Sequence, residues 1–164
     1  MFYKKFNTIA LILAAPILLY SCKLKSTAMP NVNIYAIRLK PGADLRKSIQ
    51  AFIAEHKLKA AWISTCVGSL TEYNIRFANQ PDPGSGRGHF EIVGLSGTLS
   101  VNGSHLHISV SDSTGKTIGG HLVDGCIIYT TAEIVIQSTD GLEFKRAKDG
   151  TTPWEELQVI RNEE

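Results

Sequence analysis

The feature that most constrains this fold is a β-hairpin signal in the second half of the chain. Ser113-Thr114-Gly115 is a turn-rich triplet, and a three-residue loop with glycine in the left-handed position fits it well. That loop pairs Asp112 with Lys116. Counting outward from this pair sets His107 directly opposite His121.

Three histidines are therefore expected on one face of the hairpin. His105 and His107 are two residues apart, so on a strand their side chains point the same way. Directly opposed residues also share a face, which brings His121 to the other two. Two alternatives stay open: a bulge at Gly119-Gly120 would shift the register by one residue, and a lone His-x-His pair is often a polar face in contact with solvent.

Such a trio is typical of a catalytic divalent-metal site with three protein nitrogens and one open position. Zinc is favoured because imidazole-only ligation suits it, while iron, nickel and copper stay open. Catalysis would also need an acid or base, and Glu91 and Glu133 are the candidates because each interrupts an apolar strand pattern. Alternatively, each lies on a solvated face or pairs with Arg76 or Lys116. His89 is either a fourth ligand, a substrate contact or a residue at a loop edge.

The remaining pattern predicts a single α+β domain, a mostly antiparallel sheet with one main helix. Asp44 can cap a helix that runs to about Lys57 with one apolar stripe, and His56 would then lie at its C-terminal end. The predicted strands cover residues 32–39, 60–67, 71–78, 90–101, 105–112, 126–138 and 142–146.

Turn signals separate these strands. Gly68-Ser69 is expected to end the second strand, residues 79–88 to form a loop, and Asp140-Gly141 to make a hairpin. Pro153 would begin a short helical turn near the C-terminus. Cys66 and Cys126 lie in apolar strands, where they could form a disulfide or remain buried free thiols.

The first 21 residues have the pattern of a signal peptide. Lys4 and Lys5 precede an apolar run at residues 9–20, which is shorter than the roughly 20 residues needed to span a bilayer. Residues 19–22 resemble the lipobox of bacterial lipoproteins, which implies an acylated Cys22 and a membrane anchor at the cell envelope. The alternative is an ordinary secretory peptide cut near Ser21. The predicted organisation is a signal peptide at 1–21, a tether at 22–31, a domain at 32–150 and a tail at 151–164.

Charge argues against a nucleic-acid partner. The net charge of +2 comes from Lys4 and Lys5, and without them 15 basic residues balance 15 acidic ones. A neutral chain has little attraction for phosphate backbones. No C-x-x-C and no G-x-S-x-G pattern occurs, so a zinc ribbon, a dithiol redox motif and a serine nucleophile elbow are not predicted.

The segments GTLS, HLHISVSD and GKTIGGHLVDGCIIYTTAEIVI resemble the PPC domain, also called DUF296. Gly88, Phe90 and Glu91 match the Gly-Arg-Phe-Glu-Ile-Leu signature of its plant members, with His89 in place of arginine. This resemblance covers about residues 33–145. It implies a compact domain that forms a homotrimer and, in prokaryotic members, a metal on histidines that match His105, His107 and His121. The wider fold grouping includes acetolactate decarboxylase, a zinc enzyme with a similar three-histidine site.

Three functional hypotheses follow. The leading one is an exported, lipid-anchored homotrimer whose three-histidine metal site binds or acts on a small molecule. A non-catalytic trimeric binding module is the first alternative. The second is a DNA-binding or transcription-associated protein, which requires that the N-terminus is not a signal. The plant members bind DNA through a separate Arg-Gly-Arg-Pro motif that this sequence lacks, with Gly86-Arg87-Gly88 as its nearest match.

Overall fold

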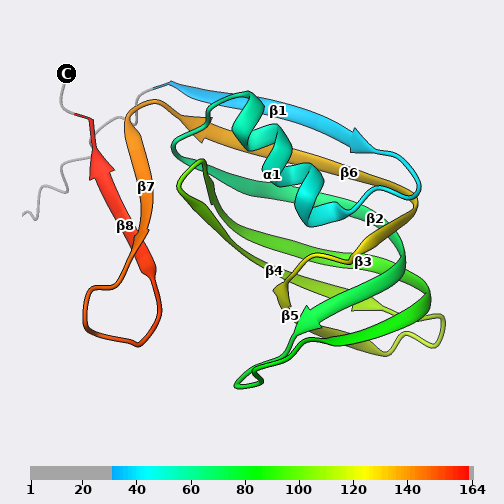
Figure 1. Ribbon diagram of the computed structural model, residues 1–164. Helices are drawn as coiled ribbons and strands as arrows, with labels where there is room; N and C mark the ends of the chain where they lie inside the picture. The colour runs from blue at the N-terminus through cyan, green and yellow to red at the C-terminus, as the bar shows by residue number, and fades with distance from the viewer. Residues whose placement is uncertain (1–30, 163–164) are drawn as a thin grey trace, which may run out of the picture.

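The structure is a computed structural model that describes residues 31–162. Antiparallel strands and one helix form the domain, which confirms the predicted α+β class (Figure 1). The predicted signal peptide and Cys22 lie outside the described residues. The elements are β1 (Val32–Leu39), α1 (Leu45–Glu55), β2 (Ala61–Arg76), β3 (Gly84–Ser100), β4 (Gly103–Ser111), β5 (Thr117–Leu122), β6 (Ile127–Thr139), β7 (Leu142–Ala147) and β8 (Glu156–Arg161).

Six strands form the main sheet, in the order β1-β6-β2-β3-β4-β5. The sheet curls so strongly at one side that β5 also pairs with the end of β2, through Ile75 with Leu122 and Arg76 with His121. Helix α1 covers one face of the sheet (Figure 1). The curled side therefore brings the last residues of β2 next to the predicted histidine hairpin.

Helix α1 forms where the sequence predicts it. The Asp44 side chain caps its first turn by accepting a hydrogen bond from the backbone N–H of Lys47 at 3.1 Å. Its second carboxylate oxygen accepts from the N–H of Gly125 at 2.8 Å and so links the helix to the β5–β6 connection. His56 is the C-cap residue, and its ring packs on Tyr35 and Phe52.

One hydrophobic core lies between α1 and the sheet. Leu45, Ile49 and Ile53 are fully buried on the helix side, where each contributes about 1.5–3 kcal/mol of burial free energy. They meet the inward side chains of the strands, among them Leu70, Ile75, Leu99, Ile108, Ile128, Ile134 and Ile136.

Two predicted boundaries in the first half of the sheet are wrong. Gly68-Ser69 does not end a strand, because β2 runs through it to Arg76. A Cβ at Gly68 would lie 2.2 Å from the carbonyl oxygen of Thr131, so glycine permits the close approach at which the pairing of β2 with β6 shifts register. The predicted loop at residues 79–88 is shorter than expected, since β3 already begins at Gly84.

The C-terminal prediction is also corrected. Asp140-Gly141 makes a turn, but β7 pairs with β8 in a separate two-stranded sheet and not with β6. The backbone of Phe144 is bonded elsewhere: its N–H donates to Lys59 O at 2.9 Å, and its carbonyl accepts from Ser100 Oγ at 2.9 Å. No helix starts at Pro153, because the chain there leads into β8.

Across residues 31–162, no helix is both long enough and apolar enough to cross a bilayer.

Candidate metal centre

The β4–β5 hairpin has the predicted register. His107 pairs with His121, and the ladder continues to Ser111 and Thr117 without a shift at Gly119-Gly120. The bulge alternative is therefore wrong.

The turn of this hairpin is fixed by Asp112. Its N–H donates to Lys116 O at 3.0 Å, which is the predicted pair. Its carboxylate oxygen Oδ1 accepts from the N–H and hydroxyl of Thr114, at 2.8 and 2.6 Å, and from the N–H of Lys116 at 3.1 Å. These bonds lower the pKa of the Asp112 carboxyl, with the Thr114 hydroxyl as the largest cause. The turn therefore fixes the register in which His107 of β4 faces His121 of β5.

A second constraint positions His121 from the other side. A Cβ on Gly120 would lie 2.5 Å from the carbonyl oxygen of Arg76 and 3.0 Å from Ile75 Cγ2. Only glycine lets β5 approach the end of β2 this closely. Because Arg76 pairs with His121, its side chain lies on the same face as the histidine cluster.

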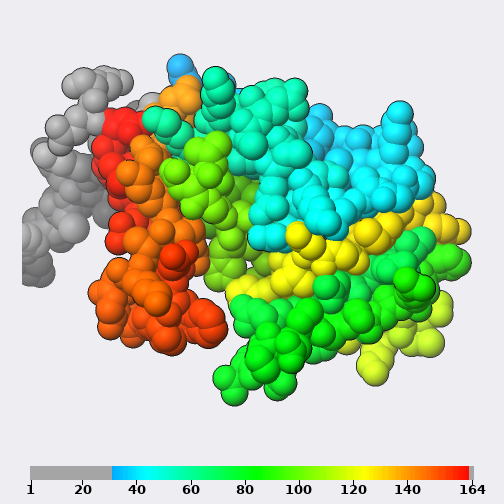
Figure 2. Space-filling view, viewed as in Figure 1, coloured from blue at the N-terminus to red at the C-terminus, as the bar shows by residue number. Residues whose placement is uncertain are grey.

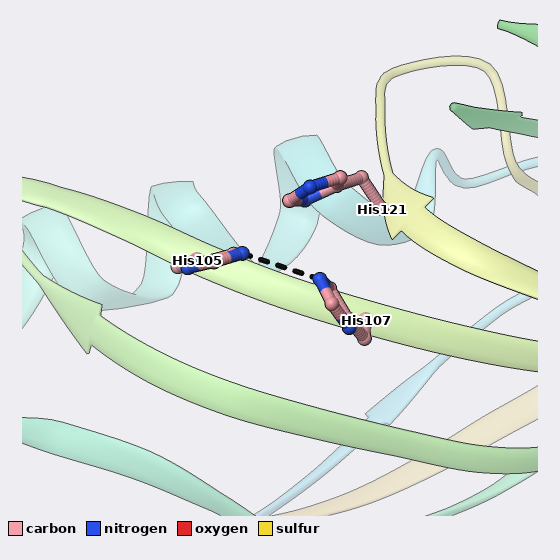
Figure 3. A group of neighbouring side chains, drawn as sticks. All are labelled: His105, His107 and His121. Carbon is pink, nitrogen blue, oxygen red and sulfur yellow. Dashed lines mark hydrogen bonds between the residues drawn. The ribbon is translucent and has the colours of Figure 1, made fainter. Parts of the chain in front are cut away.

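The three imidazoles converge as predicted. One ring nitrogen from each of His105, His107 and His121 lies within 4.8 Å of the others, and Figure 3 shows the rings directed toward a common space. The Nε2 atoms of His105 and His107 are 3.2 Å apart. Tetrahedral zinc with bonds of about 2.0–2.1 Å to nitrogen requires N···N separations of about 3.3 Å, so this pair is already at metal-binding distance.

The surroundings favour the neutral form of His105 and of His121. Burial is the main cause that lowers the pKa of His121, to about 4, and the Arg76 guanidinium is the next. Burial followed by Arg146 also lowers the pKa of His105. Neutral imidazole is the form that binds metal. His107 is exposed and the other two are half-buried, so the cluster is open to solvent on one side.

The structure does not bring Glu91 or Glu133 to the cluster. Glu91 lies in β3 opposite Ser111, four residues along β4 from His107, which corresponds to roughly 13 Å. Glu133 lies in β6 opposite Arg38, with two strands between β6 and β4. Both carboxylates are exposed, as the solvated alternative predicts. Their assignment to catalysis stays a prediction.

The other sequence candidates take structural positions. His89 stacks on Tyr129 with ring centroids 4.3 Å apart, outside the described metal cluster. Phe90 of the family signature packs edge-on against Tyr73. Cys66 and Cys126 are buried and free, so the disulfide alternative is wrong. Burial raises the pKa of Cys66 to about 12 and is the main cause that raises that of Cys126 to about 11, which leaves both thiols protonated at neutral pH.

Three residues at the site had no signal in the sequence. Arg146 Nη2 lies 3.5 Å from His105 Nδ1, and the Arg76 guanidinium carbon lies 5.9 Å from the centre of the Trp154 ring. These contacts depend on the closure of β2 on β5 and on the position of the β7–β8 hairpin. Both are long-range pairings that local patterns do not specify.

Fold and cluster together define a single α+β domain with a candidate divalent-metal centre on a β-hairpin. Residues 26–140 match the model of the Plants and Prokaryotes Conserved (PCC) domain family. The chain belongs to this family, as the sequence resemblance predicted.

Curated relatives share this domain in longer proteins. The bifunctional protein GlmU of Synechococcus sp. (strain JA-3-3Ab) is 40% identical over 129 residues, which are 79% of this chain and 21% of that protein. The AT-hook motif nuclear-localized protein 13 of Arabidopsis thaliana is 28% identical over 127 residues, 69% of this chain and 28% of that protein. The matched region thus spans only 21% and 28% of the length of these two relatives.

Solved structures share the fold. A hypothetical protein from Salmonella cholerae-suis is 39% identical with a TM-score of 0.79, over 82% of this chain and 97% of that one. A plant- and prokaryote-conserved protein from Pyrococcus horikoshii is 28% identical with a TM-score of 0.62, over 80% and 98%. The protein AF0104 from Archaeoglobus fulgidus, described as metal-containing, is 23% identical with a TM-score of 0.64, over 77% and 93%. At that identity the likeness shows the fold alone.

Proposed function

We propose that this protein binds a divalent metal, zinc in preference, through His105, His107 and His121, and that the site binds or acts on a small molecule. The convergence of three imidazole nitrogens within 4.8 Å carries this proposal. An all-imidazole donor set suits zinc, and three protein ligands leave one coordination position for water or a ligand. A bound zinc ion would polarise a carbonyl group or lower the pKa of a bound water.

The chain's own residues support such a site in three ways. The Asp112 turn fixes the strand register, Gly120 lets His121 approach, and burial lowers the pKa of His105 and of His121, which favours their neutral forms. No carboxylate of the described chain joins the cluster. A general base would therefore come from a bound ligand, water or a neighbouring subunit, and a non-catalytic binding module is the alternative within this proposal.

X-ray absorption at the metal edge tests the ligand set. Protein loaded with one equivalent of zinc should show scattering from imidazole nitrogens at about 2.0–2.1 Å. His105→Ala should lower the number of imidazole ligands that the spectrum reports. A spectrum of oxygen ligands only, unchanged in His105→Ala, would contradict the proposal.

We also propose that the chain forms a homotrimer through the sheet face opposite α1. On this face Ile34 is 68% exposed and Val67 is 57% exposed, with Tyr129 also exposed. Exposed apolar side chains on one sheet face are typical of an interaction surface.

Export and lipid anchoring at the cell envelope remain part of the proposal, based on the sequence of residues 1–22. Labelled palmitate should be incorporated into this protein, which should be found in the membrane fraction. The label should be absent from the Cys22→Ala protein. A cytosolic, unlabelled protein would contradict export.

DNA binding is the second candidate. It is favoured by two relatives, the Arabidopsis AT-hook protein and a putative DNA-binding protein from Bacteroides thetaiotaomicron with a TM-score of 0.68. The balanced charge of the chain after residue 21 opposes it. Titration of duplex DNA at low salt decides: micromolar binding with a steep salt dependence would favour this candidate.

A further inference from the structure

The β7–β8 hairpin lies entirely beyond the residues that the family model matches. That match ends at residue 140, whereas the hairpin runs from Leu142 to Arg161. In Figure 2 the hairpin (orange and red) projects beside the main sheet, and its loop end comes close to the green segment that follows β2. The contact between Trp154 and Arg76 shows that the two are neighbours.

Two guanidinium groups lie beside the histidine cluster, one at the end of β2 in contact with this hairpin and one in β7 of the hairpin itself. The first belongs to Arg76, which shares a face with His121 and is covered by the indole of Trp154 at 5.9 Å, a cation–π distance. The second belongs to Arg146, whose Nη2 donates to Glu155 O at 2.5 Å and lies 3.5 Å from His105 Nδ1.

Metal binding would change what Arg146 can do. His105 directs Nε2 toward His107 and Nδ1 toward Arg146, so Nε2 is the ligand atom. A neutral imidazole that binds metal through Nε2 carries its proton on Nδ1 and can no longer accept from the guanidinium there. Arg146 then has a free donor at the edge of the site and needs another acceptor.

The local charge also calls for an anion. Imidazole binds a metal as a neutral ligand, so three imidazoles would leave the two positive charges of a divalent ion uncompensated. Arg76 and Arg146 add two more positive charges beside the cluster. Glu156 acts on His105 as the opposing charge, and its carboxylate already accepts from Thr152 Oγ1 at 2.6 Å. Guanidinium groups match carboxylates and phosphates with paired N–H donors.

We propose that the β7–β8 hairpin forms one wall of the ligand site, and that the ligand is a small oxyanion, a carboxylate or a phosphate, held between the metal and the guanidiniums of Arg146 and Arg76. This inference rests on the proposed metal function and names its ligand class.

The test is calorimetric titration of the zinc-loaded full-length protein, with the zinc content of each sample measured first. Acetate and inorganic phosphate probe the two oxyanions, and acetamide is the neutral control. At least one oxyanion should bind and acetamide should not. Arg146→Gln and Trp154→Ala should each weaken oxyanion binding about tenfold or more, equivalent to about 1.4 kcal/mol, while zinc stays at one per chain. Arg87→Gln, an arginine with an 83% exposed side chain in β3, should change nothing.

The outcomes separate this inference from the metal site. One zinc per chain with oxyanion affinity unchanged in both variants, or no tighter than for acetamide, overturns the hairpin inference and leaves the metal site intact. A wild-type protein without stoichiometric zinc overturns both. Trp154 is 65% exposed, so Trp154→Ala removes no core packing and decides the question even where Arg146→Gln fails to fold.

Discussion

His107 and His121 face each other across the β4–β5 ladder, and their rings meet edge to face with centroids 4.5 Å apart. The turn at Asp112 fixes this register, and the absence of a side chain at Gly120 permits the close approach of β5 to β2 that positions His121. The geometry of the site is therefore a property of strand register and of one close backbone approach.

Enlarging Gly120 should damage the site. In Gly120→Ala the new Cβ would push β5 away from Arg76 O and carry His121 with it. Overpacking of this kind costs about 1–3 kcal/mol, so zinc affinity should fall about tenfold or more. Competition with a chromophoric chelator measures it. Gly94→Ala is the matched control, because a Cβ there meets only Ser109 Cβ at 4.0 Å. Equal zinc affinity in the two variants would show that the close approach of β5 to β2 does not position His121 for metal binding.

Acidification should destabilise the metal-free protein through His121. Its folded pKa of about 4 lies below the ordinary value of 6.5, so between these values the unfolded chain binds more protons. Stability should therefore fall as the pH drops from 6.5 toward 4. Urea unfolding at pH 7 and pH 4.5 should show a smaller loss in His121→Gln than in the wild type. Identical losses would mean that His121 titrates normally in the folded chain.

Removing the helix cap should cost stability without altering metal ligation. Asp44 accepts hydrogen bonds from Lys47 and Gly125, so Asp44→Ala should lower the free energy of unfolding by about 1–2 kcal/mol. Asp82→Ala, in the exposed β2–β3 loop, should change it by less than about 0.5 kcal/mol. Thermal or urea unfolding measures the loss of stability in each variant. An equal loss in Asp44→Ala and Asp82→Ala would contradict the stabilising role of the Asp44 cap.

A charge on the helix-free face should break the assembly. Light scattering should find a trimer for the wild type and a smaller species for Val67→Asp, because the exposed valine would place a carboxylate in an apolar contact. Asp82→Ala serves as a control that keeps the trimer. A wild-type monomer at micromolar concentration would contradict the proposed assembly.

Local patterns were enough to predict the histidine cluster. The turn triplet fixed the pairing of Asp112 with Lys116, and counting from there gave His107 opposite His121. The Asp44 cap and the apolar stripe likewise gave α1. These features depend on residues close together in the sequence, where turn chemistry and side-chain period decide the structure.

Long-range pairing was beyond these patterns. Gly68 is a residue type that commonly ends a strand, yet here it lies within β2. Its lack of a side chain permits a close contact with β6 that forms only in the folded sheet. Asp140-Gly141 is a hairpin signal, but Lys59 and Ser100 bind the backbone of Phe144 and direct β7 away from β6. For the same reason, the approach of Arg146 to His105 could not be predicted from their positions in the sequence.

The metal-to-chain ratio of the purified protein tests the central claim most directly. Inductively coupled plasma mass spectrometry after dialysis against trace zinc should give about one metal per chain for the wild type and for His89→Ala, whose ring lies outside the cluster. His107→Ala should hold far less. A wild-type ratio well below one that His107→Ala leaves unchanged would contradict the metal site.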